Sequence, residues 1–241
     1  MKLHKTTFNK ASLAKIPIEE QILFIQAGRF LNDFMVFHKL VSVAYKKYRN
    51  DTELKAKNVQ TFSILLKMVG ILYEGGNFIR RNLNDKGFVR HYSADLDKEY
   101  LTILNELLLY FSGNNVVSTI RNKIGFHYLD HKVREQLIGM KDGYSLEIYF
   151  SDFHANCLYH SSHIITLCSV LDLVDPADHE RAWNTLLQEI LDVSGKFIDL
   201  LGEIVSVFVK KHNKCFSSLE EIEVDDPVKL DDIELPFFVM R

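Results

Sequence analysis

Apolar residues recur every three or four positions along most of this chain, and this period restricts its fold more than any other feature. The stretch IEEQILFIQAGRFLNDFMVFHKLVSVAYKKYR, residues 18–49, shows the period clearly. Pro17 and two acidic residues open it, and lysines and an arginine close it. Proline and acids suit the first turn of a helix, and basic residues suit the last. We therefore predict a long helix over residues 18–49.

The same period, bounded by capping and turn residues, predicts further helices. Their ranges are 51–75, 96–111, 115–137, 152–173 and 178–212, with the second stopping or kinking at the glycine pair Gly75-Gly76. Residues 84–95 look like a loop, and KDGYSLEIYF at 141–150 breaks the helical pattern with a turn and branched or aromatic residues. The expected fold class is all-α, an up-and-down bundle of long helices with a short strand or irregular loop near 141–150.

The acidic residues are concentrated at the C-terminus. The net charge is −3, but residues 217–241 carry eight acids against Lys229 and Arg241, so residues 1–216 are mildly basic. We expect a single helical domain over 1–216, followed by an acidic arm whose apolar tip, ELPFFVMR, docks on a helical surface of its own or a partner chain. A mildly basic body permits contact with RNA.

The sequence also bears on the cellular compartment. Three cysteines, Cys157, Cys168 and Cys215, have no close paired spacing, which favours a reducing environment. The basic N-terminus lacks an apolar segment with a cleavage site, and no run of about 18 uninterrupted apolar residues occurs. We expect a cytoplasmic protein that does not associate with a membrane.

The segment TIRNKIGFHYLDH, residues 119–131, carries the candidate chemistry. Ile120, Ile124 and Tyr128 recur at spacing four, so the segment belongs to an amphipathic helix. His127 lies on the apolar stripe of that helix. Arg121 is six residues before His127, which on an ideal helix places the two side chains roughly 120° apart and about 9 Å along the axis. A shared site requires either a departure from ideal geometry near Gly125 or a second copy of the helix across a two-fold axis.

The run RNKIGFHY resembles the R-x(4–6)-H signature of the HEPN superfamily, in which a polar residue, often Asn, follows the Arg. Arg121, Asn122 and His127 match its three positions, and the resemblance covers about residues 50–140. It implies a helical bundle that acts as a metal-independent endoribonuclease, with two motifs meeting at a homodimer interface. Many members belong to toxin–antitoxin or phage-defence systems. The subgroup of nucleotidyltransferase-paired toxins has a Tyr two places after the His, whereas Tyr128 is adjacent here.

The chemistry of such a site can be assigned residue by residue. His127 would act as general base or acid, and Arg121 would hold the phosphate. Asn122 would be an orienting hydrogen-bond partner. Further phosphate contacts would come from Lys123, Arg80 and Arg81, which otherwise form a solvated basic face. The expected reaction needs no metal and no other cofactor. The expected partners are RNA, a second copy of the chain and an antitoxin or another protein.

Three other interpretations remain open. His127 could be a structural residue facing the core, either in an unrelated bundle or in a HEPN-like bundle without an active site. A metal site could be formed from His127, Asp130 and His131, or from Cys157, His160 and His163, although no H-E-x-x-H or C-x-x-C spacing occurs. Finally, the chain could be a non-catalytic helical dimerisation or adaptor protein.

Overall fold

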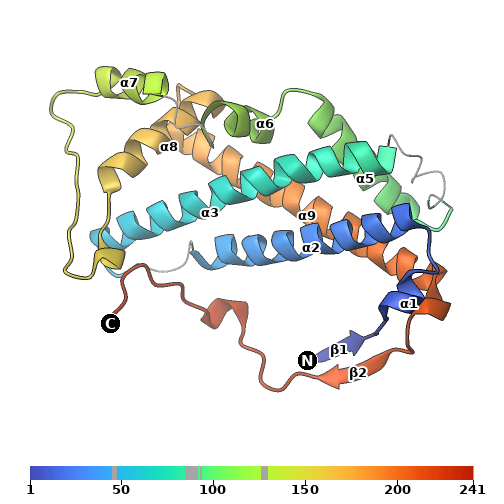
Figure 1. Cartoon of the computed structure of the whole chain (residues 1–241). Helices are drawn as coiled ribbons and strands as arrows, with labels where there is room; N and C mark the ends of the chain where they lie inside the picture. The colour runs from blue at the N-terminus through green and yellow to red at the C-terminus, as the bar shows by residue number, and fades with distance from the viewer. Residues whose placement is uncertain (45–47, 85–91, 93, 126–129, 241) are drawn as a thin grey trace.

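The computed structural model is an all-α helical bundle with one small two-stranded sheet, as the sequence predicted. It describes residues 1–44, 48–84, 92, 94–125 and 130–240. The α-helices are α1 (Lys10–Leu13), α2 (Ile18–Ala44), α3 (Asp51–Phe78), α5 (Lys98–Ser112), α6 (Val116–Ile120), α7 (Asp130–Gly139), α8 (His160–Val174) and α9 (His179–Lys211) (Figure 1). The strands are β1 (Lys2–Lys5) and β2 (Glu220–Glu223). Single helical turns occur at Ile79–Asn84 and Arg121–Gly125, which are π-helical, and at His154–Asn156, Asn213–Cys215 and Leu230–Asp232, which are 3₁₀.

Side-chain caps fix where several helices begin. Asp178, expected as a cap, accepts a hydrogen bond of 2.9 Å from the backbone N–H of Arg181 at the start of α9. At the start of α3 the cap is Asn50, which accepts from the N–H of Glu53 at 2.9 Å. The sequence had suggested Asp51 or Thr52, so this prediction was off by one or two residues. Asn is as good a cap as Asp, and propensity alone does not separate neighbours.

Helices α2, α3 and α9 form the centre of the bundle. Phe34 of α2 and Phe197 of α9 are completely buried, and their rings stack with centroids 4.7 Å apart. Phe24 of α2 stacks on Phe208 of α9 at 4.3 Å, so the two helices run antiparallel. Each large aromatic side chain buried in this way contributes roughly 1.5–3 kcal/mol.

The glycine pair in α3 does not end the helix, so the predicted stop is wrong. A Cβ at Gly75 would lie 2.9 Å from Cζ of Phe34, and one at Gly76 would lie 2.5 Å from Cδ1 of Phe111. Both glycines are buried, and the helix continues to Phe78. They serve to let aromatic rings approach the backbone of α3 closely.

Residues 141–159 are mostly irregular, which confirms the expected break in the helical pattern. Tyr149 and Leu158 exchange two backbone hydrogen bonds of 2.9 Å, and Glu147 C=O accepts one from Ser161 at 2.9 Å. These bonds hold the chain extended up to Tyr159. Helix α8 therefore begins at His160, later than the predicted start at 152.

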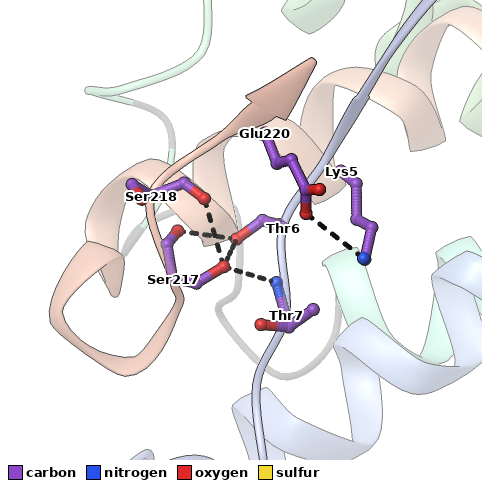
Figure 2. Close-up of polar contacts among 6 residues, drawn as sticks. All are labelled: Lys5, Thr6, Thr7, Ser217, Ser218 and Glu220. Carbon is purple, nitrogen blue, oxygen red and sulfur yellow. Dashed lines mark hydrogen bonds and ion pairs between the residues drawn. The ribbon is translucent and has the colours of Figure 1, made fainter. Parts of the chain in front are cut away.

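The two ends of the chain are paired, which the sequence did not predict. Strand β1 runs antiparallel to β2, with Lys2 opposite Glu223 and Lys5 opposite Glu220. Figure 2 shows the adjoining contacts: the hydroxyl of Thr6 donates to Ser217 C=O at 2.8 Å, and the Thr7 N–H donates to the Ser217 hydroxyl at 2.9 Å. Opposite charges on the two strands complement this pairing.

The end of the acidic arm is fastened separately. The side chain of Asn156 donates to Val239 C=O at 2.7 Å and accepts from its N–H at 2.9 Å. Phe237 and Phe238 are half-buried, whereas the side chain of Val239 remains 43% exposed. The arm therefore folds back along the molecule to the turn at His154–Asn156 (Figure 1).

Among the described residues, one helical segment is long and apolar enough to cross a membrane. It comprises α3 and the π-helical turn that follows, Asp51–Leu83, and half of its most apolar window is buried within the bundle. A central helix of a bundle passes the same test of length and composition, because burial in protein also demands apolar residues. The expected lack of membrane association therefore stays a prediction.

Candidate functional site

The described residues of the predicted site lie in two π-helical turns. Arg80 and Arg81 belong to Ile79–Asn84, and Arg121, Asn122 and Lys123 belong to Arg121–Gly125. A π-helical turn widens the helix by one residue and is frequent at functional sites. The helix thus departs from ideal α geometry at the motif itself, one of the two conditions under which Arg121 and His127 can share a site. His127 and Tyr128 lie outside the described residues.

Arg121 is held against the side of α3. Its guanidinium carbon lies 4.7 Å from the ring centre of Tyr73, and its Nη2 lies 3.8 Å from Oε1 of Glu74. Its Nη1 also lies 3.5 Å from Oδ1 of Asn122. The side chain of Arg121 is one-third exposed. A stacked, partly exposed guanidinium keeps its hydrogen-bond donors available at the edges.

The two consecutive arginines after α3 point to different surroundings. Arg80 donates to Oδ1 of Asn77 at 2.9 Å and is exposed. Arg81 lies on the wall of a groove that Arg121 also lines. Consecutive residues on a helix face directions about 80–100° apart, so only one of the pair can point into the groove.

This groove, which we call the α2–α3 groove, is open and has a volume of about 730 Å³. It lies between two helices that run antiparallel, because Phe30 contacts Phe78 at 5.1 Å between ring centroids while Phe34 contacts Gly75 (Figure 1). The lining residues are Gln26, Arg29, Phe30, Asp33, Phe37, Lys67, Gly70, Ile71, Glu74, Asn77, Phe78, Arg81, Asn82 and Arg121. The structure therefore brings Arg81 and Arg121 together. Arg80, Asn122 and Lys123 are not among the lining residues.

The groove combines cationic, acidic, amide and aromatic side chains. Four lining residues are basic and two, Asp33 and Glu74, are acidic. Within the described ranges, the side chains of Arg29, Asp33 and Arg81 form no hydrogen bond or ion pair. Guanidinium groups bind phosphate oxygens, and aromatic rings stack on bases, so this composition suits a nucleotide ligand.

Several groove residues were missed by the sequence analysis. Arg29 and Asp33 stand one turn apart in α2, and Glu74 and Asn77 stand on the face of α3 that continues to Arg81. Each was a plain polar position in a periodic helix. These residues can be identified as groove residues only when it is known which faces of α2 and α3 meet.

The second metal-binding set considered from the sequence is Cys157, His160 and His163. In the structure its member His163 packs between helices. His163 is only 8% exposed, and its ring lies 5.3 Å from that of Phe62, edge to face. Burial, with the charge of neighbouring His160, lowers the pKa of His163 to about 4. In the part of the chain that is described, no three His, Cys, Asp or Glu residues are placed to hold a metal ion. The predicted set of His127, Asp130 and His131 includes His127, which lies outside that part.

Comparison of the chain with family models, curated proteins and solved structures found no match in any of the three.

Proposed function

We propose that this chain is a metal-independent endoribonuclease of the HEPN type that cleaves single-stranded RNA. The observation that carries the proposal is the convergence of Arg81 and Arg121 on the α2–α3 groove. These residues are 40 positions apart in the sequence, and the sequence pattern predicts both as phosphate-binding side chains. Two guanidinium groups on one groove can contact successive phosphates of a strand.

The proposed reaction is transfer of the phosphoryl group within the RNA strand. A base removes the proton of the 2′-hydroxyl, the 2′-oxygen bonds to phosphorus, and the bond from phosphorus to the 5′-oxygen breaks. An acid protonates the departing 5′-oxygen, which leaves a 2′,3′-cyclic phosphate. His127 serves as base or acid, while Arg121 stabilises the charge on the phosphate oxygens in the transition state.

The π-helical turn at Arg121–Gly125 supports this assignment. The main argument against a shared site was the 120° separation of Arg121 and His127 on an ideal α-helix, and that geometry does not apply to a widened turn. The proposal includes a homodimer in the cytoplasm, in which a second motif completes the site, and an antitoxin or other regulatory protein as partner.

The test is RNA cleavage by the purified full chain. His127→Ala is expected to lower the rate about 10²–10⁴-fold, because a positioned acid or base is lost. Arg121→Ala should lose a comparable factor, and Arg121→Lys should not restore it, since an ammonium group lacks the planar fork of a guanidinium. A chelator should leave the wild type active, and the products should carry 2′,3′-cyclic phosphate.

The matched control is Arg134→Ala, which removes an exposed arginine from α7 outside the groove. It should cleave RNA like the wild type. Thermal unfolding of every variant separates loss of chemistry from loss of fold. A wild type without cleavage, combined with a destabilised His127→Ala, would contradict the proposal and support a structural His127.

The second candidate function is a non-catalytic adaptor, and exposed apolar side chains favour it. On α7, Leu137 is 50% and Ile138 is 78% exposed. In the extended segment that follows, Leu146, Ile148 and Phe150 are 44%, 48% and 80% exposed. Contiguous exposed apolar residues often mark protein interaction sites. Light scattering of the wild type and of Ile138→Ser/Phe150→Ser tests this: lost self-association with intact cleavage would assign the surface to assembly alone.

A further inference from the structure

We infer that the α2–α3 groove binds one unpaired guanine nucleotide of the RNA strand, with Asp33 contacting the base and Arg29 and Arg81 contacting a phosphate. The inference rests on the proposed function for its substrate class. It adds the identity of a bound base and names the residue that selects it.

The charges are separated along the groove. Arg29 precedes Phe30, and Arg81 follows Phe78 by three residues, so both lie near the contact between these two rings. Asp33 lies one helical turn further along α2, roughly 6 Å along its axis from Arg29. Two arginines at one end and a carboxylate one turn further in match a nucleotide, which joins an anionic phosphate to a base carrying hydrogen-bond donors.

Asp33 is the unusual residue of this groove. It is half-buried and lies between Phe30 and Phe37 in the lining of α2, and its carboxylate forms no hydrogen bond or ion pair within the described residues. A carboxylate that is partly removed from water loses solvation unless donors replace it. Two donors on a ligand, side by side, satisfy its two oxygens together.

Guanine is the RNA base that offers such a pair of donors. Its N1–H and its exocyclic amino group stand next to each other on one edge, whereas adenine, cytosine and uracil have no two neighbouring donor groups there. A carboxylate therefore forms two hydrogen bonds with guanine and at most one with the others. The aromatic rings beside Asp33 provide surfaces on which a base can stack.

Two amides in the groove have complementary free atoms. The Oδ1 atom of Asn77 accepts from Arg80 at 2.9 Å, which leaves its amino group as a donor. The amino group of Asn82 donates to Phe78 C=O at 3.1 Å, which leaves its Oδ1 as an acceptor. They are five residues apart in the sequence, and both line the groove. The donor of Asn77 suits the O6 acceptor of guanine, and Asn82 suits a ribose hydroxyl.

The experiment measures binding of 5′-GMP, 5′-AMP, 5′-CMP and 5′-UMP to the full chain by calorimetry. 5′-GMP should bind roughly ten- to a hundredfold more tightly than the other three, as expected for one bidentate contact. Asp33→Asn should remove this preference, because one acceptor oxygen becomes a donor, and should leave the weak binding of 5′-UMP unchanged. Asp152→Asn, an exposed aspartate outside the groove, is the matched control and should keep the preference.

Cleavage of RNA by the same proteins separates the two proposals. Preference for 5′-GMP that is lost in Asp33→Asn supports the inference even if no RNA is cleaved, in which case the ribonuclease proposal fails alone. Cleavage of RNA with equal binding of all four nucleotides overturns the inference and leaves the ribonuclease proposal standing. An Asp33→Asn variant that keeps the preference also overturns the inference. Absence of both nucleotide binding and cleavage overturns both.

Discussion

The two ends of α3 carry polar residues in opposite situations. At its first turn, Nζ of Lys55 lies 2.6 Å from Asp51, 2.7 Å from Glu147 and 3.4 Å from the hydroxyl of Tyr149. These hydrogen bonds raise the pKa of Lys55, and those from Lys55 and Tyr149 lower the pKa of Glu147. At the far end, the side chain of Arg81, in the turn that follows α3, has no partner among the described residues. Arg121, which packs against α3 from a separate turn, has an acid at 3.8 Å.

This difference separates structural charges from charges that are available to a ligand. The groups around Lys55 satisfy one another, so an added anion would have to displace existing hydrogen bonds. Arg29, Asp33 and Arg81 in the α2–α3 groove are held in place by helices but keep unused donors and acceptors. Unsatisfied polar groups at a concave surface are the usual mark of a binding site. The predictions below test this comparison.

The largest expected effect concerns His163, near the satisfied end. Its Nε2 has no hydrogen-bond partner among the residues that the structure describes, and burial lowers its pKa to about 4 from an ordinary value of 6.5. His163 therefore becomes protonated below about pH 6.5 in the unfolded chain, but only below about pH 4 in the folded chain. The free energy of unfolding should fall by roughly 3 kcal/mol as the pH drops through this window. Urea unfolding at several pH values measures it.

The control for this prediction is His163→Leu, which has a similar volume and does not titrate. Its stability should fall less than that of the wild type between pH 6.5 and 4. Equal falls in the two proteins would show that other groups carry the acid sensitivity.

The next effect lies at Gly75, in the last turn of α3. Gly75→Ala places a Cβ 2.9 Å from Phe34 and 3.2 Å from Phe197, both of them buried core rings. We expect a loss of about 1–3 kcal/mol from overpacking. Gly28→Ala, with open space around its Cβ, should instead stabilise by about 0.5–1 kcal/mol. Thermal unfolding distinguishes the two, and equal melting temperatures would contradict close packing at Gly75.

Replacement of one cation at each end tests the comparison directly. Arg81→Ala should weaken binding of single-stranded RNA about tenfold and reduce the slope of log affinity against log salt by about 0.7, as for one lost phosphate contact. Lys55→Met should leave both quantities unchanged and lower the melting temperature. Fluorescence titrations at several salt concentrations provide the measurement. Weaker RNA binding by Lys55→Met would remove the distinction between the ends.

The smallest effect concerns the acid beside Arg121. Glu74→Gln removes a charge 3.8 Å from the guanidinium while keeping the shape of the side chain. RNA should bind more tightly, because Glu74 competes with an RNA phosphate for the guanidinium of Arg121. The gain should be only about two- to fivefold, because an exposed ion pair is weak. Glu106→Gln, whose acid pairs with Lys196 at 2.6 Å outside the groove, serves as control and should have no effect. Unchanged or weaker binding by Glu74→Gln would show that this acid does not oppose the ligand.

Part of the candidate site could be predicted from the sequence and part could not. The motif identified Arg121 and Asn122, and the basic pair Arg80-Arg81 was evident by composition. Which of the two arginines faces the groove depends on a π-helical turn, and a widened turn has no simple sequence period. Asp33 carried no signal, because a single polar residue in an amphipathic helix is most often solvated.

The sequence by itself determined the helical bundle, since period, caps and turns are local properties that each segment carries whatever its neighbours are. It determined α9 almost to the residue, over a predicted 178–212 against His179–Lys211. The tertiary structure alone decided the role of Gly75-Gly76, the pairing of β1 with β2 and the α2–α3 groove. Each of these depends on contacts between segments distant in sequence, such as Phe34 against Gly75, and the local pattern of either segment contains no information about its partner.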